Sequence, residues 1–101
     1  MDIKYYKKSK HLHIIVRDVD DNAHLSIGIT HSPKSGHHNN ILLTRNVEVS
    51  DNKNSYILRR PIVDYKNSYK KSNKNISIPI DDIPKIKKVA TKKPQDMRKK
   101  K

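Results

Sequence analysis

Two segments of alternating polarity constrain most strongly what this chain can fold into. In residues 11–17 (HLHIIVR) and 24–30 (HLSIGIT), apolar side chains alternate with polar ones. The six residues between them (DVDDNA) are of the kinds that favour a turn. A two-residue period places the apolar side chains on one face of a strand. The two segments therefore predict an antiparallel β-hairpin with one buried face.

The turn also predicts the register of this hairpin. The expected pairs are Arg17 with His24, His13 with Gly28, and His11 with Thr30. Lys10 precedes the first strand, so this register places Lys10 near Thr30. The histidines would then lie on the polar face of the sheet.

Short strands and one helix are expected in the rest of the chain. The strands are predicted at 41–44, 47–49, 56–65 and 76–80, and Pro61 must bend the third or place it at an edge because proline cannot donate to a ladder. A helix over about 82–93 is indicated by a cap at Asp81 or Asp82, by Pro84 in its first turn, and by an apolar face of Ile83, Ile86, Val89 and Ala90. Pro94 ends it.

The fold class follows from this order of elements and from a thin supply of core residues. The chain has 101 residues, which favours one domain, and apolar residues are 33%, with no Phe or Trp. We expect a mainly β (α+β) fold: a small, strongly bent antiparallel sheet or SH3-like barrel with one C-terminal helix. The domain would comprise residues 1–93, and residues 94–101 would form a disordered lysine-rich tail.

The charge indicates a polyanionic partner. The formal net charge is +13, which favours nucleic acid first and an anionic membrane surface second. The absence of Cys excludes disulfides and thiolate zinc sites. No signal peptide or membrane span is predicted from the sequence, so we expect a soluble, cytoplasmic protein with no membrane partner.

The six histidines do not form a recognised metal motif. His11 and His13 share a strand face, and imidazoles at this spacing can share an ion such as zinc, but no carboxylate is placed beside them. The better interpretation is a polar sheet face, with no metal and no cofactor. Motifs of common hydrolases, including G-x-S-x-G and H-E-x-x-H, are also absent from the sequence.

Metal-independent cleavage of RNA requires fewer specialised groups than a metal site or one of these hydrolase motifs. Attack by the 2′-OH needs a proton acceptor, a proton donor and cations around the phosphate. Residues 30–34 supply Thr30, His31, Ser32 and Lys34, and the hairpin would bring Lys10 beside them, with His13 and His38 close enough to join. The alternative is that SPKSG is an ordinary turn.

Residues 10–40 resemble the ToxN/AbiQ nuclease toxins of type III toxin–antitoxin systems, within the PemK/MazF-like superfamily. The resemblance rests on a lysine before a strand (Lys10), the motif HSPK (residues 31–34) and the pair His38–Asn39. It implies a PemK-like barrel, with Lys10 and Lys34 as phosphate-stabilising or proton-transferring groups and Ser32 orienting the scissile phosphate. It also implies an antitoxin of RNA or a small acidic protein. His31 replaces the family's threonine, so it is either the base or a sign of lost activity.

The function indicated is therefore an RNA-directed basic protein, either a metal-independent endoribonuclease of the toxin type or an inactive relative. The rivals are a non-catalytic nucleic-acid-binding accessory protein of a phage or mobile element, and an adaptor that binds a nucleoprotein. Tyrosines among lysines suit base stacking, although they also suit a core without Phe. The predicted binding residues are Tyr6, Lys8, His13, His38, Arg59, Arg60, Lys70 and Lys71.

Overall fold

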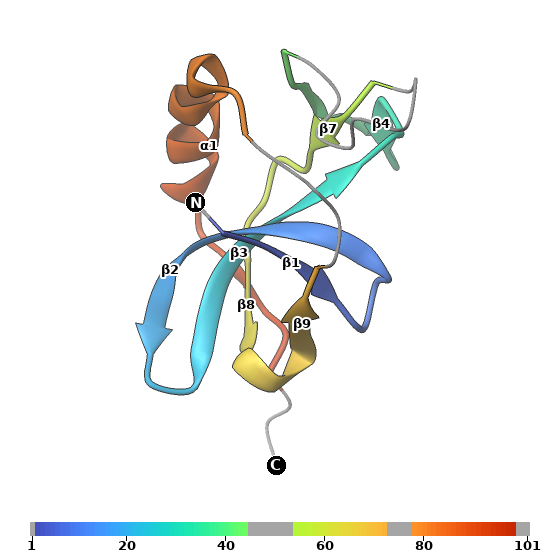
Figure 1. The fold of residues 1–101 in the computed structure, drawn as a ribbon. Helices are drawn as coiled ribbons and strands as arrows, with labels where there is room; N and C mark the ends of the chain where they lie inside the picture. The colour runs from blue at the N-terminus through green and yellow to red at the C-terminus, as the bar shows by residue number, and fades with distance from the viewer. Residues whose placement is uncertain (1, 45–53, 73–77, 99–101) are drawn as a thin grey trace.

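A computed structural model describes residues 2–44, 54–72 and 78–98 of the chain. Its main element is a curved sheet of eight strands whose central path runs β10–β8–β3–β2–β1–β9. These strands are β1 (Asp2–Tyr6), β2 (His11–Asp20), β3 (Ala23–Thr30), β8 (Ile62–Tyr65), β9 (Tyr69–Lys71) and β10 (Gln95–Asp96). The sheet also includes β7 (Tyr56–Ile57), which pairs with β3, and β6 (Ile41–Leu42), which pairs with β7. Figure 1 shows β2 and β3 as the long central hairpin.

The predicted hairpin is confirmed, but its register is only partly as expected. His13 lies opposite Gly28, as predicted. Arg17 lies opposite Leu25 and His24 opposite Asp18, because the register shifts between Ile15 and Arg17. Such a bulge adds a residue to one strand, which the alternation of polarity alone does not reveal.

The remaining strands are shorter than expected. The 41–44 prediction reduces to β6, and the 56–65 prediction becomes β7 and β8, separated by residues 58–61 at the predicted proline bend. The expected strand at 47–49 lies outside the described residues. Of the expected strand at 76–80, the described part is not a strand and ends in a short 3₁₀ helix, η2 (Ile80–Asp82).

The C-terminal helix is confirmed as α1 (Ile83–Ala90), with Pro84 in its first turn. It ends three residues before the expected end at Lys93. Asp82 stands at the cap position but makes no side-chain cap bond. Its carboxylate instead accepts hydrogen bonds from the backbone and hydroxyl of Thr44 and from Lys85. Asp82 thus attaches the chain after β6 to the start of the helix.

Helix α1 covers the apolar face of the sheet, on the side seen above the hairpin in Figure 1. Ile86 and Val89 are fully buried there, as the spacing predicted. They belong to one apolar cluster with Leu12, Ile14, Ile27, Ile29, Leu43 and Ile57. The alternation of β2 and β3 therefore decides which face the helix covers.

Two regions depart from the predicted boundaries. Strands β1 and β9 were not predicted; β1 pairs with β2 on one side and β9 on the other. Residues 95–98 lie in the segment predicted as a disordered tail, yet β10 pairs in parallel with β8. Residues 99–101 lie outside the described residues. The mainly β fold with one short helix is as predicted, and the sheet is not closed into a barrel.

Candidate nucleic-acid interface

Residues 30–40 form an exposed hairpin that projects from the end of β3. The hairpin contains β4 (Lys34–Ser35) and β5 (His38–Asn39), with Lys34 opposite Asn39. Gly36 lies in its turn with a φ of 62°, a left-handed conformation that glycine adopts without a Cβ penalty. Ser32, Lys34 and His38 are all exposed.

Hydrogen bonds to neighbouring residues hold this hairpin in place. The Asn40 side-chain amide donates to the Ser32 carbonyl and the Ser35 hydroxyl, at 3.0 and 2.9 Å. The Ser32 backbone N–H donates to the Thr30 hydroxyl at 3.2 Å. His31 Nδ1 lies 3.0 Å from the Asn54 carbonyl oxygen. Predicted catalytic residues 30–34 thus belong to one ordered loop.

Lys10 lies at a different turn, between β1 and β2. Its backbone N–H donates to the Tyr6 carbonyl, its φ is 60°, and its side chain is exposed. Within the described ranges, no hydrogen bond or ion pair joins Lys10 to Ser32 or Lys34. The convergence of Lys10 with the loop therefore remains a prediction.

Arg59 and Arg60 connect the hairpin to the end of helix α1. Arg59 Nε donates to the Asn39 carbonyl on β5. Arg60 Nε donates, at 3.3 Å, to the carbonyl of Lys93 just after the helix. Both arginines are exposed. In the described part of the chain, no contact occupies their terminal Nη groups, which can still donate to a phosphate.

These contacts define a basic strip, which we call the arginine strip. It runs from the β4–β5 hairpin across residues 59–60 to the residues after α1. Its basic members are Lys34, Arg59, Arg60, Lys92 and Lys93, all exposed, and His38 lies on β5 beside them. The sequence indicated Arg59 and Arg60 as binding residues. Lys92 and Lys93 join the strip because the chain after α1 lies beside Arg60.

Lys70 and Lys71 lie on the edge strand β9, and both are exposed. The Lys70 ammonium lies 4.9 Å from the centre of the Tyr5 ring, a cation–π distance. Lys71 lies opposite Lys4 on β1. This edge is basic, and nothing in the described contacts connects it to the arginine strip.

Tyr6 and His13, both predicted to bind nucleic acid, lie inside the protein, with 3% and 4% of their surface exposed. The Tyr6 ring lies 4.6 Å from the His13 ring and 4.9 Å from the Tyr69 ring, centre to centre. His13 Nδ1 is 3.0 Å from the Ser26 hydroxyl, which is 2.7 Å from the Tyr69 hydroxyl. The polar face of the hairpin is therefore a polar core, and these rings are not available for base stacking.

Gly28 makes room for this polar core. A Cβ at Gly28 would lie 2.9 Å from Leu58 Cδ1 and 3.3 Å from His13 Nε2. Burial, followed by the charge of His11, lowers the pKa of His13 to about 4. Burial raises the pKa of Tyr69 to about 12, and burial together with Asp64 raises the pKa of Tyr6. His13 is thus neutral at pH 7 and unsuited to attract phosphate.

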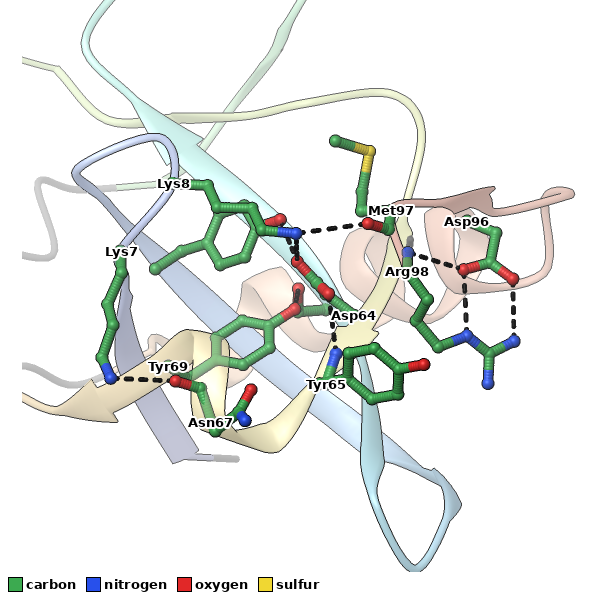
Figure 2. A network of polar contacts seen from close by, with 11 residues as sticks. Lys7, Lys8, Asp64, Tyr65, Asn67, Tyr69, Asp96, Met97 and Arg98 are labelled. Atoms are coloured by element: carbon green, nitrogen blue, oxygen red, sulfur yellow. Dashed lines mark hydrogen bonds and ion pairs between the residues drawn. The ribbon is translucent and has the colours of Figure 1, made fainter. Parts of the chain in front are cut away.

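Lys8 is the cationic partner of a buried carboxylate, as Figure 2 shows. Its ammonium lies 2.8 Å from Asp64 Oδ2 and also donates to the Met97 carbonyl at 3.2 Å. Tyr6 donates to the same carboxylate oxygen at 2.5 Å. Burial opposes ionisation of Asp64, but the bonds from Lys8 and Tyr6 outweigh it and lower the carboxyl pKa. Lys8 is thus held in place by the fold.

His24 links Asp18 and Lys4 in a second polar group that the sequence did not predict. His24 Nδ1 lies 2.7 Å from Asp18 Oδ1, and its Nε2 lies 3.2 Å from the Lys4 ammonium. Lys66 pairs with the other oxygen of Asp18 at 3.1 Å. Three charges from distant parts of the sequence meet here, and only the sheet topology brings them together.

Two further properties of the described residues bear on the site. They contain no group of three or more His, Asp or Glu side chains arranged to hold a metal ion. Nor does any helix in ranges 2–44, 54–72 and 78–98 have the length and apolar character needed to cross a membrane.

No protein-family model matches this chain, and no curated protein or solved structure is significantly similar to it.

Proposed function

We propose that this protein binds RNA, and that the arginine strip is its main contact with the phosphate backbone. The observation that carries the proposal is the placement of Arg59 and Arg60. Each is anchored through Nε to a backbone carbonyl, one on β5 and one after α1. Anchoring in this way leaves the forked Nη donors for phosphate and reduces the entropy lost on binding.

The charge of the whole chain supports the same proposal. A formal net charge of +13 attracts a polyanion over a distance, and the strip supplies local contacts where cations from three segments meet. The predicted aromatic partner Tyr6 is buried, so the strip acts mainly through charge. We therefore expect weak dependence on RNA sequence at this surface.

The direct test measures binding of a fluorescein-labelled oligouridine by fluorescence anisotropy. Arg59→Ala and Arg60→Ala should each weaken binding about fivefold, because each removes one phosphate contact. Arg17→Ala is the matched control, since Arg17 is an exposed arginine on β2 outside the strip. Equal losses in all three variants would show that only net charge matters and would overturn the strip.

A narrower proposal is that the same surface cleaves RNA, as the resemblance to ToxN/AbiQ toxins implies. It is favoured by the ordered loop in which the Thr30 hydroxyl accepts the Ser32 N–H and Asn40 holds the Ser32 carbonyl. Thr30 and Ser32 carry hydroxyls in the same loop as the exposed Lys34. Lys34 would stabilise charge on the phosphorane, and Thr30 or His31 would transfer the proton.

Cleavage is tested by incubating purified protein with RNA, with and without a metal chelator. The narrower proposal predicts cleavage in both, and loss of cleavage in Lys34→Ala with an unchanged circular dichroism spectrum. Lys87→Ala, which removes an exposed lysine from α1 outside the strip, should retain it. Intact RNA at high protein excess would reject cleavage and leave the non-catalytic accessory function.

The resemblance also implies a finer fold assignment. We propose that the curved sheet and its covering helix are a short form of the PemK-like, SH3-like barrel. Support comes from the curvature of β2 and β3 seen in Figure 1 and from the proline bend between β7 and β8. Closure of the barrel requires the two edge strands, β9 and β10, to meet. An experimental structure in which they pair would support this assignment, and a sheet that stays open there would reject it.

A further inference from the structure

A small hollow lies at the opposite end of the hairpin from residues 30–40. It is formed where the turn between β2 and β3 meets the end of β8 and the 3₁₀ helix η1 (Lys66–Ser68). Its volume is about 300 Å³, and it is lined by Asp21, Asn22, Tyr65, Lys66 and Asn67. None of these residues belongs to the arginine strip.

Tyr65 gives the hollow an aromatic wall. Of the chain's five tyrosines, all within the described residues, Tyr65 is the exposed one, at 41%. Its backbone N–H donates to Asp64 Oδ1 at 2.8 Å, which fixes the residue to the buried carboxylate. In the view of Figure 2, the Tyr65 ring and the Asn67 side chain lie between Lys7 and Arg98. A flat, accessible ring on a fixed strand is a platform for a planar ligand.

Backbone hydrogen bonds hold the polar walls of the hollow. The Lys66 N–H donates to the Asn22 carbonyl at 2.8 Å, joining the turn to η1. The Asn22 N–H donates to Asp20 Oδ1 at 2.7 Å, and Lys7 donates to the Asn67 carbonyl at 2.9 Å. The side-chain amides of Asn22 and Asn67 have no partner among the described residues, so they can bond a ligand.

Charge at the hollow selects the kind of ligand. Asp18 pairs with Lys66, and Asp20 pairs with Arg98, whereas Asp21 has no ion pair within the described part of the chain. An unpaired carboxylate repels a phosphate placed beside it. It accepts hydrogen bonds from a neutral planar ring that carries N–H donors. Guanine fits this requirement because its N1–H and N2–H are adjacent and match the two oxygens of a carboxylate.

We propose that this hollow binds one unpaired guanine base, stacked on Tyr65 and hydrogen-bonded to Asp21, with Asn22 and Asn67 at its rim. The inference rests on the proposed RNA binding and deepens it, because it adds base preference to a phosphate-directed surface. The strip would supply affinity, and the hollow would choose the nucleotide.

Nuclear magnetic resonance with nucleosides tests the hollow without a phosphate. Guanosine should shift the amide signals of Asn22, Lys66 and Asn67 and bind roughly tenfold more tightly than inosine, which lacks the N2 amine. Asp21→Asn should remove this difference, and the matched control Asp81→Asn, an exposed carboxylate on η2, should keep it. Tyr65→Ala should abolish the shifts, and Tyr65→Phe should retain them. Equal shifts with uridine, or none in the hollow, would overturn the proposal.

A second measurement separates failure of the hollow from failure of RNA binding. A uridine nonamer and the same nonamer with a central guanosine are compared by anisotropy, with an expected preference of about tenfold for the second. Equal binding of both nonamers would reject the guanine site and keep the arginine strip. Guanosine shifts without binding of either nonamer would keep the site and reject the proposed RNA function.

Discussion

Asp64 shows how a single buried charge organises this protein. Its side chain is fully buried, its charge is balanced by Lys8, and the Tyr6 hydroxyl donates a hydrogen bond to it. A buried carboxylate without a partner is costly, so these two contacts are requirements of folding. Lys8 was predicted to bind nucleic acid, but it is already committed to this carboxylate.

Replacement of Lys8 should therefore weaken folding. Lys8→Ala should lower the free energy of unfolding by about 2 kcal/mol, less than for a fully buried pair because the Lys8 side chain is 41% exposed. Urea denaturation at pH 7 measures the change. Lys10→Ala, which removes an exposed lysine from the same turn, is the control. Equal stability of the two variants would contradict the role assigned to Lys8.

His13 should make stability depend on pH. Its pKa of about 4 in the folded protein is below the usual value of 6.5, so folding favours the neutral ring. The stabilisation is complete above pH 6.5 and is lost as pH falls from about 6.5 to about 4, a change of about 3 kcal/mol. When the pH is lowered from 7 to 4.5, the free energy of unfolding measured by urea denaturation should fall less in His13→Gln than in His38→Gln. Identical declines would rule the effect out.

At the scale of elements, β10 attaches the end of the chain to the sheet. The N–H groups of Gln95 and Met97 donate to the carbonyls of Pro61 and Val63, at 3.0 and 2.8 Å. Arg98 then contacts Asp20 and Asp96. The lysines of this segment predicted disorder, but its backbone pairs with the edge of the sheet at β8.

This pairing predicts slow hydrogen exchange at two amides. The N–H groups of Gln95 and Met97 should exchange at least roughly tenfold more slowly than in an unstructured peptide, because each is in a ladder bond. Arg98→Ala should speed both up by removing the ion pair that anchors the segment. Amide exchange followed by nuclear magnetic resonance measures the rates. Exchange at peptide rates in the unmodified protein would show that β10 is not formed.

Elements were predicted well where one segment contains the whole signal. The alternation in 11–17 and 24–30 and the apolar spacing of Ile86 and Val89 both correspond to observed elements. Strands β1 and β9 carry no such signal: β1 forms a local hairpin with β2, and β9 pairs with β1 across more than sixty residues of sequence. Among the candidate binding residues, Arg59 and Arg60 are exposed, as a binding role requires, whereas the burial of His13 depends on which residues cover its face of the sheet.

At the scale of the molecule, the arrangement of charge sets how RNA binding should respond to salt. The arginine strip contains five Lys and Arg residues, all exposed. Five phosphate contacts with a single strand give a slope of about −3.5 in a plot of log affinity against log salt, or roughly a 100-fold loss between 50 and 200 mM. Anisotropy titrations with oligouridine at four salt concentrations measure the slope. A slope near zero would contradict binding through phosphates.

The sequence by itself determined the hairpin, the C-terminal helix, the mainly β class and the large positive net charge. Each of these depends on local periodicity or on total charge, which do not require knowledge of distant contacts. Only the tertiary structure decided that the polar hairpin face is a core around Asp64, that Lys8 pairs with this buried carboxylate, and that Arg59 and Arg60 join two basic segments. These features depend on pairing between residues far apart in the chain, and such pairing is set by how the whole sheet curves and packs.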